Sequence, residues 1–371
     1  MEMPERTCDP GPHTEVVDCD RIVRDPSVSA VMITYNHEPY IAQAIEGVVS
    51  QETDFPIELI IGEDCSTDRT REIVLDYQRR YPELIRVLLT EKNLGMHANF
   101  RRTILAARGK HVAFCEGDDW WHRRDKLQTQ IHALEADSAL VLVSAGIQRV
   151  SAEGQVLGPG EQSDARRPLR RISYEDIMFG RAFHHASTVV ARTDAVRQAV
   201  LGDTLCADHR QLWGDMPLWL ELSQMGATIQ LGETLASYRQ SPNSATRQRD
   251  PLHSWRFNIS GNDIRYRALE RYPLPGDPTV TSKMKARLVW RITIRAAWVG
   301  DAKTVRTQFR RLRSLGDRPR WREIACLLLA FTPLPRRALT VVCLRLISLL
   351  EAIGVKPRAY FHASVLHDQE R

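Results

Sequence analysis

Short apolar runs alternate with amphipathic stretches over the first two thirds of this chain. The apolar runs have the length and β-branched content of buried strands, and they occupy residues 28–34 (VSAVMIT), 57–61 (IELII), 84–89 (LIRVLL) and 112–115 (VAFC). Apolar residues at helical spacing lie between them and predict helices from near Glu38, over 70–80 and over 96–107. Strands that alternate with helices predict an α/β fold with a doubly wound, mainly parallel sheet.

Polar loops follow three of the predicted strands, at 34–37 (TYNH), 63–68 (EDCSTD) and 116–119 (EGDD). Ligands of open α/β sheets bind beyond the carboxyl ends of the strands, so we expect these loops to share one site. The sequence has no GxGxxG after the first strand and no GxxxxGK[ST], so a phosphate ligand needs another partner. Carboxylates at 116, 118 and 119 are the oxygen ligands that Mg²⁺ or Mn²⁺ prefers. The alternative is that Asp119 caps a helix beginning at Trp120 or Trp121.

These motifs, in this order, resemble the family 2 glycosyltransferases, which are nucleotide-sugar-dependent enzymes of the GT-A fold. The resemblance covers about residues 28–240 and rests on the segments 28–51 (VSAVMITYNHEPYIAQAIEGVVSQ), 58–74 (ELIIGEDCSTDRTREIV), 93–121 (NLGMHANFRRTILAARGKHVAFCEGDDWW) and 214–226 (GDMPLWLELSQMG). It implies a nucleotide site, with UDP as the nucleotide, formed by Thr34, Tyr35, Asn36, Glu38, Glu63, Asp64, Ser66 and Asn99.

The resemblance also implies a metal motif and a general base. The family's D-x-D motif falls on Glu116-Gly117-Asp118, where Glu replaces the usual first Asp. This departure leaves open how metal binding is shared with Asp119, and we predict Asp118 as the direct ligand. Asp215, at the start of a predicted amphipathic helix, stands where inverting enzymes of the family have their general base. The alternative is a helix N-cap with Pro217 in the first turn, and the two roles are compatible.

Weaker candidates have structural alternatives of similar weight. His184 and His185 precede an apparent strand over 186–190, and they either line an acceptor pocket or serve as ordinary structural histidines. Trp120 and Trp121 have the flat apolar faces that stack on sugars, but we expect at least one in the core. By the same resemblance Arg239 approaches the diphosphate, against the alternative of a solvated loop arginine.

The C-terminal third differs in charge from the rest. From Thr281 onward there are 19 Lys or Arg against 6 Asp or Glu, a net charge of +13, whereas the remainder has 32 against 40, a net charge of −8. We expect a linker at 273–278 and one or two helices over 284–313. The apolar runs 324–331 and 338–353 are shorter than the ~20 residues that span a bilayer. A basic amphipathic surface for anionic lipid, which we favour, and a helical subdomain packed on the catalytic domain both stay open, whereas nucleic-acid binding is disfavoured.

Composition places the chain among globular proteins of a reducing compartment. It has 371 residues, 43% of them hydrophobic, and seven scattered cysteines without metal-site spacing. The polar N-terminus has no apolar segment of a secretory signal. We therefore expect a cytoplasmic protein at the inner face of the membrane, with a flexible lead-in at 1–27, a catalytic domain at 28–245 and a helical, membrane-peripheral region at 246–371.

The expected function is that of an inverting, metal-dependent glycosyltransferase of the hexosyltransferase class. Its partners would be a nucleotide-sugar donor, a divalent metal (Mn²⁺ or Mg²⁺) and a hydroxyl acceptor on a glycan or lipid-linked glycan of cell-surface polysaccharide synthesis. One alternative is a catalytically inactive module that binds nucleotide sugars. Another is a metal-dependent sugar nucleotidyltransferase, which would normally have a Gly-rich basic loop where this chain has residues 34–38.

Overall fold

The computed structural model describes residues 14–160, 169–240, 251–298 and 300–316. The chain divides into two compact units, 1–281 and 282–371. The strands of the first unit are β1 (Thr14–Val16), β2 (Val28–Thr34), β3 (Ile57–Glu63), β4 (Ile85–Leu89), β5 (His111–Phe114), β6 (Trp120–Trp121), β7 (Leu140–Ser151), β8 (Val156–Pro159), β9 (Leu169–Arg171), β10 (Val190–Arg192) and β11 (Ala227–Gln240).

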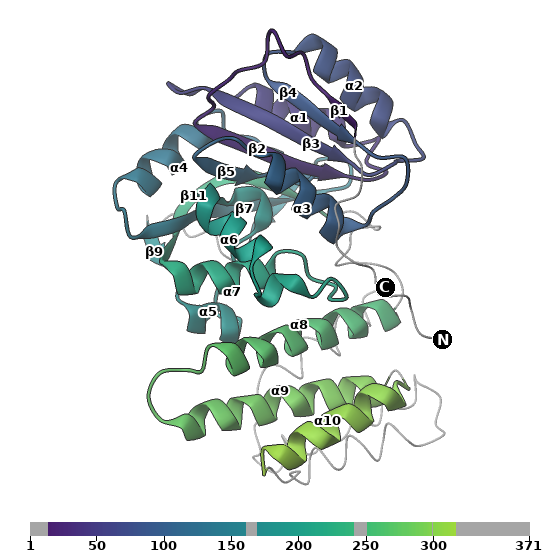
Figure 1. The fold of residues 1–371 in the computed structure, drawn as a ribbon, viewed down its shortest axis with the longest axis vertical. Coiled ribbons are helices and arrows are strands. Elements are labelled where there is room, and N and C mark those ends of the chain that lie inside the picture. Colours follow the sequence, from purple (N-terminus) through teal and green to yellow (C-terminus); the bar gives the residue numbers. More distant parts are fainter. Residues whose placement is uncertain (1–13, 161–168, 241–250, 299, 317–371) are drawn as a thin grey trace. The chain divides into compact units, whose positions relative to one another are not determined.

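Helices connect most of these strands (Figure 1). They are α1 (Ile41–Val49), α2 (Thr70–Arg80), α3 (Met96–Ala106), α4 (Lys126–Glu135), α5 (Tyr174–Phe179), α6 (Thr193–Leu201), α7 (Met216–Met225) and α8 (Pro251–Arg271), with α9 (Pro278–Trp298) and α10 (Ala302–Ser314) following.

The sheet has the strand order β1-β4-β3-β2-β5-β10-β7-β11-β6. The four strands β4, β3, β2 and β5 are parallel, as the alternation of strands and helices predicts. β10 enters antiparallel between β5 and β7, and β7 pairs with β11 in parallel. Because two reversals restore the direction, β7 points the same way as β5. The fold is therefore a mixed, mostly parallel α/β sheet, which confirms the predicted class.

Helices cover both faces of the sheet, as expected of a doubly wound fold (Figure 1). One face buries Ala30 and Met32 of β2 against apolar residues of α1, α2 and α4. On the other face Phe114 of β5 lies between two aromatic rings, with centroids 5.6 Å from Phe100 of α3 and 5.7 Å from Trp219 of α7. Buried aromatic side chains each remove about 150–250 Å² from water, so this stack anchors α3 and α7 to the sheet.

A buried ion cluster lies near the amino ends of the parallel strands. Glu58 of β3 is fully buried and accepts hydrogen bonds from Ser29 (2.6 Å), Arg86 (3.0 Å) and Arg108 (2.7 Å). Burial alone would raise the pKa of Glu58, but the hydrogen bonds from Arg108, Ser29 and Arg86 outweigh it and the pKa lies below its usual value. This carboxylate is therefore ionised and fully compensated by the protein.

Several local expectations need correction. The lead-in is not loose throughout, because Thr14–Val16 pair with β4 and Glu15 bonds Arg86 at 2.6 Å. Trp120 and Trp121 form β6 against β11, so Asp119 does not cap a helix there. The apparent strand at 186–190 begins with a 3₁₀ turn over Ala186–Thr188, and β10 begins at Val190. In each case pairing with a distant segment overrides the local pattern.

The first unit extends past the expected boundary at residue 245, up to Thr281. α8 belongs to it, together with Tyr272, the residue that follows α8. Trp213 stacks on Phe257 of α8 with ring centroids 4.3 Å apart, and the Tyr272 hydroxyl donates to Glu221 of α7 at 2.6 Å. Both contacts join α8 to the segment that contains α7.

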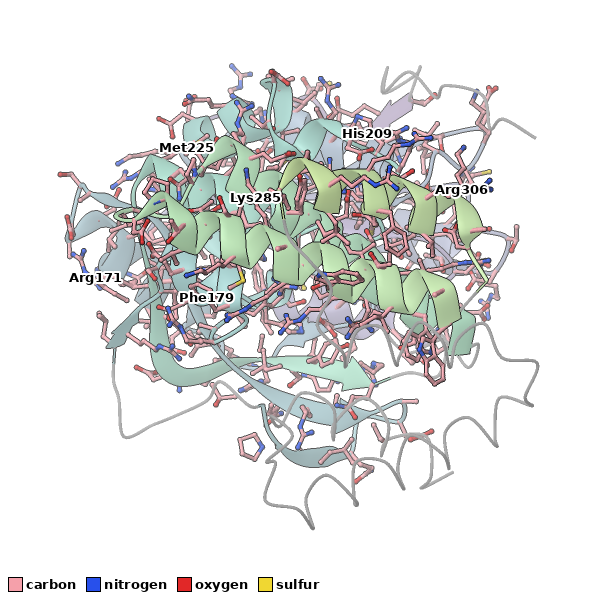
Figure 2. The ribbon with its side chains drawn as sticks, turned by 90° about the horizontal axis from the view of Figure 1, so that it is seen from below. Arg171, Phe179, His209, Met225, Lys285 and Arg306 are labelled. Atoms are coloured by element: carbon pink, nitrogen blue, oxygen red, sulfur yellow. The ribbon has the colours of Figure 1, made fainter. Side chains whose placement is uncertain are left out.

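The second unit contains most of α9 and all of α10, which lie side by side (Figures 1 and 2). Trp290 meets Phe309 edge to face with ring centroids 6.0 Å apart, so the region expected to hold one or two helices over 284–313 contains two helices that contact each other. Residues 278–316 contain ten Lys or Arg and one Asp, and Figure 2 labels Lys285 and Arg306 among the basic ones. Within the described ranges no helix is both long and apolar enough to cross a bilayer. The apolar runs 324–331 and 338–353 lie outside the described residues.

Candidate active site

A cavity of about 1300 Å³ opens at the carboxyl ends of β2 and β5. It brings together residues that the sequence analysis selected from six separate segments. Those in its wall are Thr34, Tyr35, Asn36, Asp64, Asn99, Glu116, Asp118, Asp119, His185 and Asp215. Other selected residues lie outside the lining, among the described parts of the chain, and these are Glu38, Glu63, Ser66, Trp120, Trp121, His184 and Arg239.

The loops after β2 and β3 are tied to each other. The Asn36 amide donates to Ser66 Oγ at 3.0 Å, and Asn36 Oδ1 accepts from the Thr67 amide at 2.8 Å. Asn36 has φ of 55°, a left-handed conformation that asparagine tolerates better than most residues. Glu38 supports the same junction by accepting from the Arg69 amide at 3.1 Å. Glu38 and Ser66 therefore hold the two loops together, and Tyr35, 43% exposed, stands at the cavity mouth.

Two acids at the end of β3 have different tasks. Glu63 is fully buried, forms an ion pair with Arg71 and accepts a hydrogen bond from the Ser66 amide at 2.6 Å. It therefore fixes the loop that follows β3 from inside the protein. Asp64 lines the cavity and accepts from the amides of Leu94 (2.8 Å) and Gly95 (2.9 Å). Gly95 has φ of 85°, which only glycine adopts freely. The sequence could not distinguish these roles, since both acids follow the same strand.

Asn99 joins this half of the site to α3. Its side chain donates to the Gly62 carbonyl at 2.8 Å and accepts from Arg102 Nε at 2.8 Å. A Cβ at Gly62 would lie 2.5 Å from Asn99 Oδ1, so the close approach requires glycine. Asn99 is buried and positions β3 as well as lining the cavity.

Four carboxyl groups gather at the centre of the cavity. Glu116, Asp118 and Asp119 follow β5, and Asp215 approaches from the start of α7. Burial raises the pKa of Glu116 well above its usual value, and the charges of Asp118, Asp119 and Asp215 raise it further. Like charges in a poorly solvated site repel each other, so this cluster has a deficit of positive charge.

Asp119 is held by the protein on both oxygens. Ser187 Oγ donates to Oδ2, and the Arg239 amide donates to Oδ1 at 2.9 Å. Burial raises its pKa well above the usual value, Asp118 adds to the rise, and the bonds from Ser187 and Arg239 oppose it. Asp119 therefore orients the acidic loop, and Glu116 and Asp118 are the carboxylates better placed to take an external ligand.

Arg239 acts as a clamp beneath the acidic loop. Its guanidinium donates to the carbonyls of Asp118 (2.9 Å) and Ala152 (2.6 Å) and to Gln43 Oε1 (2.6 Å). The rings of Tyr40 and Trp120 flank it, with centroids 4.6 and 4.8 Å away. Burial lowers the pKa of Arg239. The structure thus places Arg239 inside the protein and not in the cavity lining.

Asp215 is the N-cap of a helix and has a raised pKa. Its Oδ1 accepts from the Met216 amide at 2.7 Å, which makes Asp215 the N-cap of α7, with Pro217 in the first turn. Burial raises the pKa of Asp215 to about 6, against the lowering effects of that amide and of Trp219. A carboxylate with a pKa near the working pH is suited to accept a proton. The cap leaves part of the carboxylate facing the cavity.

The remaining aromatic candidates separate into core and cavity residues. His184 is fully buried between Ser144 (2.7 Å) and Thr228 (3.1 Å), and burial lowers its pKa to about 3, so it is structural. His185 lines the cavity beside Tyr238, and burial lowers its pKa to about 4. Trp121 is buried and donates to the Ser187 carbonyl at 2.8 Å.

The carboxylates of Glu116 and Asp118 have the chemistry that could hold a divalent cation. Among the residues that the structure describes there is no group of three or more His, Cys, Asp or Glu arranged to hold a metal ion. Two half-buried carboxylates, Glu116 and Asp118, line the cavity, and their repulsion raises the pKa of Glu116. Mg²⁺ and Mn²⁺ accept such sites, in which one or two carboxylates, waters and substrate phosphates complete the coordination.

The cavity residues that the sequence analysis missed include two arginines, Arg149 of β7 and Arg265 of α8. Ala145, Ile147 and Arg149 all line the cavity, which is the period-two spacing of one face of a strand. The alternation was visible in the sequence, but no local feature indicated that this face borders the site. Arg265 lies beyond the segments that resemble the family.

Part of the sequence matches a known protein-family model. Residues 29–194 match the family model described as "Glycosyl transferase family 2". An uncharacterized protein of Mycobacterium tuberculosis is 33% identical over 216 residues, which are 57% of this chain and 58% of that protein. The chain thus spans 58% of the length of this relative. The putative teichuronic acid biosynthesis glycosyltransferase TuaG of Bacillus subtilis is 28% identical over 59% of this chain and 81% of its own length.

Solved structures share the fold at low sequence identity. TarS of S. aureus, in complex with UDP-GlcNAc, matches with a TM-score of 0.55 and 15% identity, over 79% of this chain and 93% of that chain. A mannosyltransferase of Pyrobaculum calidifontis, in complex with GDP-Man and Mn²⁺, matches with a TM-score of 0.50 and 18% identity, over 94% of this chain and 89% of that chain. At these identities the likeness concerns the fold.

Proposed function

We propose that the protein transfers a sugar from a nucleotide-diphosphate sugar to an acceptor hydroxyl with inversion at the anomeric carbon, as the match of residues 29–194 to the model of glycosyl transferase family 2 supports. The observation that carries the proposal is the meeting of the β2 and β3 loops, the carboxylates of Glu116 and Asp118, and Asp215 in one cavity. The complexes of TarS with UDP-GlcNAc and of the mannosyltransferase with GDP-Man and Mn²⁺ support a nucleotide-sugar donor. We favour UDP as its nucleotide.

Each part of the cavity has a task in this reaction. Thr34, Tyr35, Asn36 and Asp64 would bind the nucleotide at the ends of β2 and β3. Glu116 and Asp118 would hold Mn²⁺ or Mg²⁺, which when bound supplies positive charge that offsets the charge of the departing nucleoside diphosphate. Asp119 and Arg239 would keep this loop in position through their hydrogen bonds.

Asp215 would take the proton from the acceptor hydroxyl as the oxygen attacks the anomeric carbon. Its pKa of about 6 leaves most of the carboxylate ionised at neutral pH and still able to hold a proton during the reaction. The Met216 amide donates a hydrogen bond to Oδ1 of Asp215. Because this bond fixes the carboxylate at the start of α7, it also sets the direction of Oδ2. Because the acceptor oxygen attacks the anomeric carbon on the side opposite to the departing nucleoside diphosphate, the configuration of that carbon is inverted.

Asp215→Asn tests the proposal. A thermal-shift screen over nucleotide sugars with Mn²⁺ first identifies the donor, and release of nucleoside diphosphate with water as the acceptor then measures turnover. We expect Asp215→Asn to lower turnover about 10²- to 10⁴-fold and to leave donor affinity unchanged, because a general base contributes about that much. EDTA should abolish turnover of the wild type.

Asp203→Asn is the matched control, since that carboxylate is fully exposed and its loss should leave turnover unchanged. Turnover of Asp215→Asn close to the wild-type value would contradict the role of the base. A wild-type protein that binds a nucleotide sugar but never releases the nucleoside diphosphate would instead be an inactive binding module.

We further propose that the acceptor is a glycan or lipid-linked glycan and that the second unit contacts an anionic membrane. The support is the ten basic residues against one acid in 278–316, together with the teichuronic acid role in the name of TuaG. Basic helical surfaces bind anionic headgroups, and salt screens this attraction. The protein should sediment with vesicles that contain phosphatidylglycerol and not with pure phosphatidylcholine, and high salt should release it. Equal binding to both vesicles would contradict this.

A further inference from the structure

The cavity is larger than a nucleotide sugar needs. Its volume of about 1300 Å³ exceeds the ~300–1,000 Å³ of pockets for single small ligands, so it has room for a second substrate. The strand order shows where that room lies. β7 is two strands from β5 and three from β2, which at ~4.8 Å per strand places it about 10 Å from the acidic loop and about 14 Å from the nucleotide loops.

This far part of the cavity contains two arginines. Arg149 lies near the carboxyl end of β7, opposite Tyr238 of β11, and Arg265 extends from α8. A Cβ at Gly180 would be 3.9 Å from Nη2 of Arg265, which places this guanidinium beside the loop that follows α5. Both side chains line the cavity. Their charge is opposite to that of the central carboxylates, so the wall is divided into an acidic centre and a basic end.

Two buried nitrogen atoms in the same region lack hydrogen-bond partners among the described residues. They are Nε of Arg149 and Nδ1 of His185, whose ring lies 4.5 Å from that of Tyr238. A buried polar group without a hydrogen-bond partner destabilises the folded protein, and more so when it is charged. A ligand with acceptor oxygens would remove that cost. Arginine binds carboxylates and phosphates through paired hydrogen bonds, which suits a group of that kind.

We propose that Arg149 and Arg265 form an anion subsite that binds a carboxylate or phosphate group of the acceptor. The inference rests on the proposed function, because the location of the nucleotide and of Asp215 defines the acceptor end. The donor diphosphate is the other anion that the cavity would hold. Its place is beside Glu116 and Asp118, two strands away from β7, and for that reason we assign the arginines to the acceptor.

The test measures binding of small probes to the full chain saturated with UDP and Mn²⁺. The anionic probes are glycerol 3-phosphate and glucuronate, and their neutral partners are glycerol and glucose. We expect the wild type to bind at least one anionic probe and neither neutral partner. Arg149→Gln and Arg265→Gln should each weaken that binding at least about tenfold and change UDP affinity less than about twofold. Arg149→Lys should retain part of the binding.

Arg124→Gln is the matched control, because it removes the same charge from an ion pair whose side chains are about 70% exposed. If Arg149→Gln and Arg265→Gln weaken UDP as strongly as the probes, the arginines serve the donor diphosphate and the assignment is wrong. If they weaken UDP-glucuronate but not UDP-glucose, the anion belongs to the donor sugar, which also overturns it. Equal binding of anionic and neutral probes by the wild type contradicts the subsite. A wild type that binds no nucleotide contradicts the proposed function itself.

Discussion

Buried carboxylates lie in opposite electrostatic environments at the amino ends and at the carboxyl ends of the parallel strands. Near the amino ends, Glu58 is surrounded by Ser29, Arg86 and Arg108, and its pKa lies below the usual value. At the carboxyl ends, burial and neighbouring acids raise the pKa of Glu116, and Arg239, a cation next to the acidic loop, donates its hydrogen bonds to carbonyls and Gln43. The parallel sheet thus has a carboxylate with its hydrogen-bond and charge partners at the amino ends of its strands and, at the carboxyl ends, carboxylates that have no such partners among the described residues.

This difference distinguishes a structural ion cluster from a binding site. A buried charge that the protein itself neutralises contributes to a defined fold, and removing one partner is costly. A group of acids that no protein cation neutralises lowers the stability of the fold, because the acids repel each other. A positively charged ligand can reduce this repulsion. The contrast predicts that substitutions at the two edges change stability in opposite directions.

Glu58→Gln should produce the largest effect. It leaves Arg86 and Arg108 without their shared anion, so we expect the free energy of unfolding to fall by about 3–5 kcal/mol. Urea unfolding followed by tryptophan fluorescence measures the loss. Glu52→Gln, in an ion pair with side chains about 70% exposed, should change it by less than about 0.5 kcal/mol. A similar small change for both variants would show that the cluster around Glu58 has no special role.

Asp215→Asn should produce the next largest effect, with the opposite sign and a pH dependence. The pKa of Asp215 is raised from 3.8 to about 6, so the folded state binds the proton more tightly than the unfolded one. The wild type should therefore lose stability as the pH rises from about 4 to about 6, and the variant should not. Asparagine keeps the N-cap, so the variant should be more stable at pH 7 by up to about 3 kcal/mol. A stability difference that does not vary with pH would contradict this.

Glu116→Gln should have the smallest effect on stability and a clear effect on the cation. The substitution removes one of several acids that repel each other. We therefore expect the unfolding temperature to stay unchanged or to rise slightly, which corresponds to a gain of about 1 kcal/mol or less in the free energy of unfolding. The additional stabilisation that Mn²⁺ gives in the presence of UDP should be reduced. Asp118→Asn should reduce it more, since we predict Asp118 as the direct ligand. Full retention of the Mn²⁺ effect in both variants would exclude these carboxylates as ligands.

The sequence predicts the parts of this molecule that local patterns determine. The strands at 28–34 and 57–61, the loops that follow them and the acids at 116–119 all lie in continuous segments with clear periodicity. The acidic centre could be predicted because parallel strands bring their carboxyl ends to one edge.

The missed features depend on partners far apart in the chain. Trp120 and Trp121 form a strand only because β11 lies beside them, and Glu15 is ordered by Arg86, which is 71 positions away. The clamp role of Arg239 depends on Gln43, 196 positions away. None of these partners can be chosen from local propensity.

The hydrogen bond between Tyr272 and Glu221 sets how far the protein can be shortened. Glu221 is buried in the middle of α7 and accepts from the Leu205 amide (2.7 Å) as well as from the Tyr272 hydroxyl (2.6 Å). A fragment that ends at residue 245 would lose this hydroxyl and leave one oxygen of a buried carboxylate without its donor, on the helix whose first turn holds Asp215. The smallest fragment that keeps Asp215 in place therefore extends through Tyr272, well past residues 29–194, which match the family model.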